Sequence, residues 1–245
     1  MLSIFKTKPL LKDLIPKNFV DIHSHLLPGI DDGSKSVEET ASLMTQMNGL
    51  GINHFITTPH IFTNVWDNTE AGITEKLQVT KAELNRKNYF ASFNAGAEYM
   101  IDSFFMKRLE TEKLLTLKDN YLLVEMSYLN PPMQLFDILF EVQLAGYKPI
   151  LAHPERYLFY TNKLKEYERL KKSGCLFQLN LLSTVNYYGT GIAKTADYLL
   201  QNGMIDFVGT DIHHQNHIDA FSRKVCLKNT LELEKAINKN LFFLP

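Results

Sequence analysis

The chain has 245 residues, of which 45% are hydrophobic, and its 26 Lys and Arg against 27 Asp and Glu give a formal net charge of -1. This composition supports a sizeable core, and it excludes both an intrinsically disordered chain and a broadly basic nucleic-acid-binding surface. Cys175 and Cys226 lack the spacing of a metal site, so we expect two free thiols in a reducing compartment.

Residues 1–17 are weakly basic, and Lys6, Lys8 and Lys12 interrupt their apolar runs. No run approaches the about 20 apolar residues of a membrane helix, and no small-residue cleavage site follows. We therefore predict an N-terminal arm over 1–17 within a single domain of residues 1–245. We also expect a cytoplasmic location and no membrane insertion.

Short β-branched or aromatic runs alternate with helical spacing along the chain. Strands are predicted at 19–23, 54–58, 91–97, 121–125, 149–152, 176–181 and 206–209. The first helix is predicted after the capping-box pattern Ser36-Val-Glu-Glu39, and Gly51 ends it. Further helices are predicted near 70–87, 133–145, 163–173, 192–201 and 231–239. Seven such units indicate a parallel β/α barrel, closed or nearly closed, with a doubly wound open sheet as the alternative.

Histidines cluster at the carboxyl ends of the predicted strands. Five of the eight lie there: His23, His25, His60, His153 and His213. In a strand, side chains two residues apart share a face, so the two histidines of Asp21-Ile-His-Ser-His project together. The carboxyl ends of strands form the functional face of a β/α barrel. We therefore predict a metal cluster rather than scattered structural histidines.

Carboxylates occur at the same ends. Glu98 ends Phe93-Asn-Ala-Gly-Ala-Glu, and Glu125 interrupts the apolar run Tyr121-Leu-Leu-Val-Glu-Met. A carboxylate leaving such a strand is costly unless it is paired or binds a cation, although a salt bridge to an arginine would also satisfy it. Asp31-Asp32-Gly33 also describes an ordinary turn. Mixed nitrogen and oxygen donors suit Zn, Mn or Fe.

These motifs resemble the polymerase-and-histidinol-phosphatase (PHP) superfamily of metal-dependent phosphoesterases. They are more similar to its bacterial protein-tyrosine-phosphatase branch, which accompanies tyrosine kinases that control capsule and exopolysaccharide synthesis. The motifs are Asp21-Ile-His-Ser-His-Leu-Leu-Pro-Gly-Ile-Asp-Asp-Gly33, Thr57-Thr-Pro-His60, Leu151-Ala-His-Pro-Glu-Arg156 and Gly209-Thr-Asp-Ile-His213. The resemblance runs from about Asn18 to His213 and implies the PHP fold, a distorted seven-stranded (β/α)7 TIM-like barrel of the α/β class.

The resemblance also implies a ligand set for three divalent metal ions, with Mn²⁺ favoured and Fe or Zn as alternatives. The first ion is expected to bind His23, His25, Glu98 and Asp211. The second is expected to share Glu98 and to add Glu125 and His153. The third is expected to bind Asp32, His60 and His213. Asp31 could replace Asp32 after a one-residue shift of the loop.

Arg156 is the phosphate-binding arginine that the resemblance implies, with a catalytic and substrate-binding role. Its planar guanidinium matches phosphate oxygens. Members of the family often have another basic residue after the last D-x-H segment, but this sequence has no arginine there before Arg223. We expect His217, or else His214, to make that substrate contact.

Clustered cations lower the pKa of bound water and neutralise phosphate, which allows metal-activated hydroxide to attack phosphorus in line. The resemblance thus predicts a protein-tyrosine phosphatase whose phosphotyrosyl substrate is a bacterial tyrosine kinase. A cysteine nucleophile is not expected, because Cys175 begins no C-x5-R loop. The alternatives are a small-molecule phosphomonoesterase such as histidinol phosphatase, an amidohydrolase, and an inactive metal-binding module.

Three segments that would surround the mouth of the site are rich in aromatic residues and proline: 61–66, 128–132 and 157–160. Such side chains could stack on a phosphotyrosine ring and accommodate a peptide. The alternative is that they pack only against their own helices.

Overall fold

Nine strands form two parallel sheets in the computed structural model, which describes residues 7–161 and 163–245. The strands are β1 (Phe19–Asp21), β2 (Ile52–Thr57), β3 (His60–Ile61), β4 (Ser92–Ala95), β5 (Glu98–Met100), β6 (Tyr121–Glu125), β7 (Lys148–Ala152), β8 (Leu176–Asn180) and β9 (Phe207–Gly209). The three-stranded sheet has the order β1-β2-β4, and the six-stranded sheet has the order β3-β5-β6-β7-β8-β9. All seven predicted strands are present, and the α/β class with parallel sheets is confirmed.

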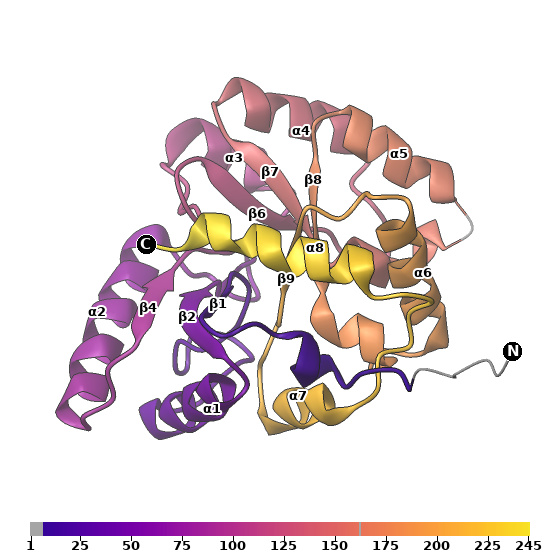
Figure 1. Cartoon of the computed structure of the whole chain (residues 1–245). Helices are drawn as coiled ribbons and strands as arrows, with labels where there is room; N and C mark the ends of the chain where they lie inside the picture. Colours follow the sequence, from indigo (N-terminus) through magenta and orange to yellow (C-terminus); the bar gives the residue numbers. More distant parts are fainter. Residues whose placement is uncertain (1–6, 162) are drawn as a thin grey trace, which may run out of the picture.

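Helices connect the strands and lie around their outside (Figure 1). They are α1 (Val37–Gly49), α2 (Glu70–Arg86), α3 (Phe105–Thr111), α4 (Leu135–Leu144), α5 (Leu164–Lys172), α6 (Thr190–Gln201), α7 (Gln215–Asp219) and α8 (Leu231–Lys239). Short 3-10 helices are η1 (Leu11–Leu14), η2 (Pro154–Arg156), η3 (Leu158–Tyr160), η4 (Leu181–Val185), η5 (Ala220–Ser222) and η6 (Asn240–Phe243). The unpredicted α3 and α7 have only 7 and 5 residues, too few to give a helical period.

Within the described part of the chain, no helix is both long and apolar enough to cross a membrane.

Helix α1 begins where the sequence predicts. The Ser36 hydroxyl accepts a hydrogen bond from the backbone N–H of Glu39 at 3.2 Å. The Glu39 carboxylate, however, accepts from the N–H of Lys35 at 2.8 Å. Only the first half of the predicted capping box therefore forms, and the glutamate binds one residue further back.

In the described part of the chain, the strands pair as two separate parallel sheets, so one closed seven-stranded sheet is not confirmed. The reason is two bends, one between β2 and β3 and one between β4 and β5. Pro59 in the first bend has no N–H to donate to a ladder. Gly96 N–H donates to Thr57 O at 2.9 Å, and Glu98 N–H donates to Pro59 O at 3.1 Å. Hydrogen bonding thus continues through the bends while the strand pairing passes from one sheet to the other.

The outer strands of the two sheets meet beyond their carboxyl ends. Ser24 after β1 and Ile212 after β9 form an isolated parallel bridge. Beside it, His25 N–H donates to Ile212 O at 2.9 Å, and Asp211 N–H donates to His23 O at 2.7 Å. These bonds hold the segments that follow β1 and β9 against each other.

The predicted N-terminal arm lies partly outside the described residues, at positions 1–6. From residue 7 onward the chain packs against the segment after η5. Leu11 is buried, its N–H donates to Arg223 O at 3.0 Å, and Leu10 bridges Lys224.

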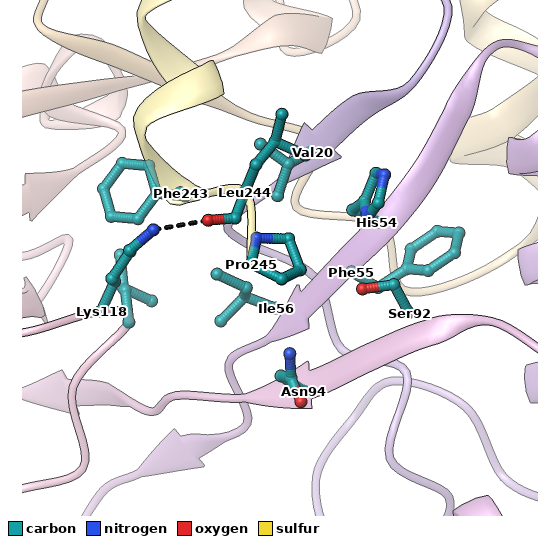
Figure 2. A pocket seen from close by; sticks show the side chains of 11 residues that line it. Val20, His54, Phe55, Ile56, Ser92, Asn94, Lys118, Phe243, Leu244 and Pro245 are labelled. Atoms are coloured by element: carbon teal, nitrogen blue, oxygen red, sulfur yellow. Dashed lines mark hydrogen bonds between the residues drawn. The ribbon is translucent and has the colours of Figure 1, made fainter.

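A small apolar cluster lies on the face of the strands opposite the main, helix-covered core. It includes Val20, Ile56, Leu123 and Phe207, with Phe243 from η6. Lys118 holds the C-terminal residues there by donating to the carbonyl of Phe242 and to that of Leu244. Figure 2 shows the bond to Leu244. A pocket of about 180 Å³ opens beside these residues, and none of the predicted site residues lines it.

Candidate metal centre

The structure brings all nine predicted metal ligands together. They are His23, His25, Asp32, His60, Glu98, Glu125, His153, Asp211 and His213, all at strand ends or bends, or in the segments that follow β1, β7 and β9. Six are buried, His60 and His213 are partly exposed, and Asp32 is exposed.

Glu98 lies at the centre of the cluster. Its Oε2 is 3.1 Å from His23 Nε2 and 3.2 Å from His60 Nδ1. Its Oε1 is 3.1 Å from His153 Nε2. Because its two oxygens face different imidazoles, this carboxylate is placed to bridge two cations.

Asp211 directs its two oxygens to different partners. Its Oδ1 lies 3.3 Å from the Nε2 atoms of His23 and of His25. Its Oδ2 accepts hydrogen bonds from Arg156 Nη1 at 2.6 Å and from Asn180 Nδ2 at 2.9 Å. The φ angle of Asp211, 52°, lies in the left-handed region, which an L-residue adopts only at an energetic cost. Both oxygens of the Asp211 carboxylate are thus held in place by neighbouring side chains.

Asp32, rather than Asp31, faces the remaining histidines. Asp32 Oδ1 is 3.4 Å from His213 Nε2 and 3.6 Å from His60 Nε2. Asp31 is buried behind His25, with its Oδ2 2.8 Å from His25 Nδ1. The neighbouring carboxylates therefore make different contacts, one with the ligand cluster and one with the far side of a histidine.

Gly33 permits this loop geometry. A Cβ atom at residue 33 would lie 2.1 Å from His25 O, so any larger residue would displace the loop that carries Asp31 and Asp32. The same Asp31 carboxylate accepts from Gly33 N–H at 2.9 Å.

The surroundings keep the central carboxylates ionised. Burial alone would raise the pKa of Glu98, but His23 and His60 hold that pKa well below its usual value. Burial would also raise the pKa of Asp211, but His23 and His25 hold it well below its usual value. Deprotonated carboxylates are the forms that bind cations.

The donor set fits divalent metal ions. Its atoms form four overlapping groups, each within 4.8 Å: His25, Asp32, His60 and His213; His23, Glu98 and His153; His23, His25 and Asp211; His60, Glu98 and Glu125. Donors bound at about 2.1 Å to one ion lie about 3.0–3.4 Å apart in octahedral to tetrahedral geometry, close to the separations above. His60 Nδ1 is buried without a hydrogen-bond partner although Glu125 Oε1 is 2.9 Å away. A cation between these donors would satisfy both.

Two residues of β8 that the sequence reasoning missed support the ligands. Gln178 Oε1 is 2.7 Å from His23 Nδ1, and Asn180 donates to Asp211. A Cβ atom at Gly209 would lie 2.5 Å from Gln178 Nε2 and 2.6 Å from His23 Cβ, so glycine is required for these side chains to meet. Gln178 holds the proton of His23 on Nδ1 and leaves Nε2 free for a metal.

Replacing Gln178 with Leu is expected to weaken divalent-metal affinity about 10- to 100-fold, because His23 loses the acceptor that fixes its tautomer. Gln178→Glu keeps an acceptor and should retain more of the affinity. Titration of Mn²⁺ in competition with a chelating dye measures the effect. Unchanged affinity in the Leu variant would remove Gln178 from this role.

Arg156 lies in η2, next to the ligand cluster. Its guanidinium carbon lies 5.0 Å from the ring centre of Tyr128 and 4.3 Å from that of Tyr188. Burial alone would lower the pKa of Arg156, but Asp211 holds it above its usual value, so the side chain stays charged. Within the described residues, Asp211 is the hydrogen-bond partner of the guanidinium through Nη1. The other N–H groups can meet phosphate oxygens.

His217 lies behind His213 rather than among the donors. Its Nδ1 accepts from the backbone N–H of His213 at 3.2 Å, and its ring packs edge-on against Tyr187. Burial lowers the pKa of His217 to about 4, which keeps the ring neutral. The guanidinium of Arg223 also lies over the ring of Tyr187, 5.1 Å from its centre. The predicted substrate contact of His217 stays a prediction.

The environment of Cys175 does not suit a nucleophile. Both cysteines are free, and Cys175 is buried in an apolar environment that raises its pKa to about 12. A thiol with so high a pKa is protonated near neutral pH and is a poor nucleophile.

The aromatic residues near the mouth differ in exposure, and Phe62, Trp66 and Phe159 are partly buried. Tyr157 and Tyr160 are buried, and the Tyr157 hydroxyl accepts from Met126 N–H at 2.9 Å. These two pack within the fold, as the alternative interpretation held. Tyr128 is 45% exposed and stacks on His153, so it remains accessible beside the cluster.

Parallel strands with converging histidines and carboxylates at their ends define an α/β protein with a candidate multinuclear metal centre. The chain belongs to the family described as "Capsular polysaccharide synthesis, CpsB/CapC", whose family model matches residues 19–240.

Relatives of known name support this membership. The chain is 29% identical to the tyrosine-protein phosphatase CpsB of Streptococcus pneumoniae over 87% of this chain and 94% of that protein. It is 27% identical to the tyrosine-protein phosphatase YwqE of Bacillus subtilis over 80% of this chain and 77% of that protein. A solved structure described as a metal-dependent tyrosine phosphatase of the YwqE and CpsB type aligns with a TM-score of 0.76 and 27% identity, over 88% of this chain and 86% of that one.

The fold is also similar to that of an amidohydrolase from Mycoplasma synoviae, with a TM-score of 0.50 over 98% of this chain and 89% of that one. The identity is only 11%, so this likeness concerns the fold alone.

Proposed function

We propose that the protein is a metal-dependent protein-tyrosine phosphatase acting through the nine donors and Arg156. The observation that carries the proposal is the ion pair between Arg156 and Asp211, which places a charged, planar donor beside the candidate cation sites. A phosphoryl group has several oxygens, so it can contact cations and a guanidinium at once. The names of the CpsB and YwqE relatives support the same activity.

The donors would hold three divalent ions, with Mn²⁺ favoured and Fe or Zn as alternatives. Five imidazoles and four carboxylates suit these metals. When bound, such ions would lower the pKa of a water molecule and neutralise phosphate charge.

The chain's own residues would orient the substrate. Arg156 would bind the phosphoryl oxygens through its free N–H groups, and the rings of Tyr128 and Tyr188 would keep the guanidinium in place. A phenolate leaving group has a pKa of about 10 and needs less protonation than an alkoxide, so tyrosyl esters demand least from a general acid.

We also propose the finer architecture and setting. The two sheets together would form a distorted barrel of seven strands, in which β2 and β3 count as one bent strand and β4 and β5 as another. The Ser24–Ile212 bridge supports this description. The protein would act in the cytoplasm. Its substrate would be a bacterial tyrosine kinase of capsule or exopolysaccharide synthesis, consistent with the description of the family.

Removal of metal by chelation is expected to abolish hydrolysis of a phosphotyrosyl peptide, and added Mn²⁺ should restore it, because the proposed chemistry needs the cations. With metal restored, kcat/KM should be higher for this peptide than for a phosphoseryl peptide or histidinol phosphate. Full activity in protein shown to be metal-free would contradict the proposal. A preference for histidinol phosphate would favour the small-molecule alternative, and metal binding without any turnover would favour an inactive module.

A further inference from the structure

Exposed apolar side chains gather on four loops beside the ligand cluster. These loops follow β3, β5, β6 and β7, which are neighbours in the six-stranded sheet. Large apolar side chains on them are 46% to 104% exposed: Val65, Phe104, Leu129, Met133 and Leu158, here called the apolar rim. Exposed apolar side chains on loops that share one end of a sheet indicate an interaction surface.

The other side of the mouth differs. The residues of η4 after β8 are buried, and the exposed residues directly after β9 are polar: His214, Gln215 and Asn216. In the described chain, no large exposed apolar side chain lies between β1 and α1. The apolar rim therefore borders the cluster on one side only.

Tyr128 adjoins the rim in sequence and lies against His153 and Arg156. The Tyr128 ring stacks on His153 with 5.8 Å between ring centres and lies beside Arg156. Leu129 is the next residue, and Met133 follows before α4 begins. The most exposed residues of the rim thus lie on the same loop as the ring that contacts the Arg156 guanidinium.

We infer that the apolar rim binds apolar residues that flank the phosphotyrosine in an extended substrate segment, an inference that rests on the proposed function. Leu129 lies four residues beyond Glu125, so it is at most about 14 Å from that ligand. Three or four extended substrate residues span the same length. A second copy of the chain bound at the rim would instead cover the mouth against a protein substrate, so we favour the substrate segment as occupant.

The double variant Leu129→Ser/Met133→Ser tests the inference. It should lower kcat/KM about tenfold, through KM, for a phosphotyrosyl peptide with Leu and Val flanks, because burial of these two side chains is lost. Hydrolysis of free phosphotyrosine, which has no flanks, should be unchanged. Phe140→Ser/Leu144→Ser is the matched control, since these side chains of α4 are 59% and 64% exposed but lie outside the rim.

The wild type should also prefer the apolar-flanked peptide to one with Ser and Gly flanks. Equal kinetics on the two peptides, or equal losses in rim and control variants, would overturn the inference. So would dimerisation, measured by light scattering, that the rim variant abolishes without any change in peptide kinetics. If the wild type hydrolyses neither the phosphotyrosyl peptides nor free phosphotyrosine, the proposed function fails. Fluorescence anisotropy with the apolar-flanked peptide then decides: weaker binding by the rim variant supports the inference, and equal binding overturns it.

Discussion

Replacing Glu98 with Ala is expected to remove most of the bound metal and to lower kcat by about a thousandfold or more. Glu98 faces His23, His60 and His153 at 3.1 to 3.2 Å, so its loss leaves two proposed ions without their shared ligand. Several kcal/mol of transition-state stabilisation correspond to such a factor. Metal content after dialysis against Mn²⁺, together with turnover of a phosphotyrosyl peptide, measures both effects.

The control for this variant is Glu141→Ala, which removes an exposed glutamate of α4 that belongs to none of the donor groups. It should keep full metal content and turnover. Circular dichroism of both variants separates loss of metal from loss of structure. A Glu98→Ala enzyme with normal metal content and normal turnover would exclude Glu98 as a ligand.

The gathering of histidines and carboxylates was predictable because several of them interrupt or directly follow a buried apolar strand. Glu125 ends the buried β6, and His153 follows the buried residues of β7. Polar groups in such positions need a partner, and the carboxyl ends of parallel strands gather them in one place. The α/β class followed from the same alternation of strands and helices.

The bends were not predictable from local patterns. Pro59 shows that a ladder bond is lost, but the pairing that follows, His60 with Glu98, depends on a contact between residues 38 positions apart. The short strands β3 and β5 are therefore a consequence of tertiary structure. The different contacts of Asp31 and Asp32 likewise depend on the conformation of the turn.

The supporting residues were missed although one signal was present. Gln178 and Asn180 are two positions apart in β8, so they share a face of the strand. That alternation shows that the two side chains point the same way, but it does not identify what they contact. Their partners, His23 and Asp211, follow β1 and β9 and are far away in the sequence. The sequence also did not predict which aromatic residues of the mouth are exposed. Aromatic content alone did not distinguish the buried Tyr157 from the accessible Tyr128.

Replacing Arg156 with Ala is expected to lower kcat/KM for a phosphotyrosyl peptide about 10²- to 10³-fold, the usual cost of removing a donor to the developing negative charge. Metal content should stay nearly unchanged. The reason is that Asp211 Oδ2 keeps its second donor, Asn180 Nδ2 at 2.9 Å. Arg156→Lys restores charge without the planar fork and should recover only part of the activity.

The double variant Arg156→Ala/Asn180→Ala shows which role Arg156 has. Both donors to Asp211 Oδ2 are then absent, so this carboxylate is free to turn and metal should be lost together with activity. Asn180→Ala alone should keep most of its metal, because Arg156 still holds Asp211. Loss of metal in proportion to activity in the single Arg156→Ala variant would mean that the arginine acts by orienting Asp211. Retained metal with lost phosphate binding, measured by inhibition with inorganic phosphate, would instead assign it to the substrate.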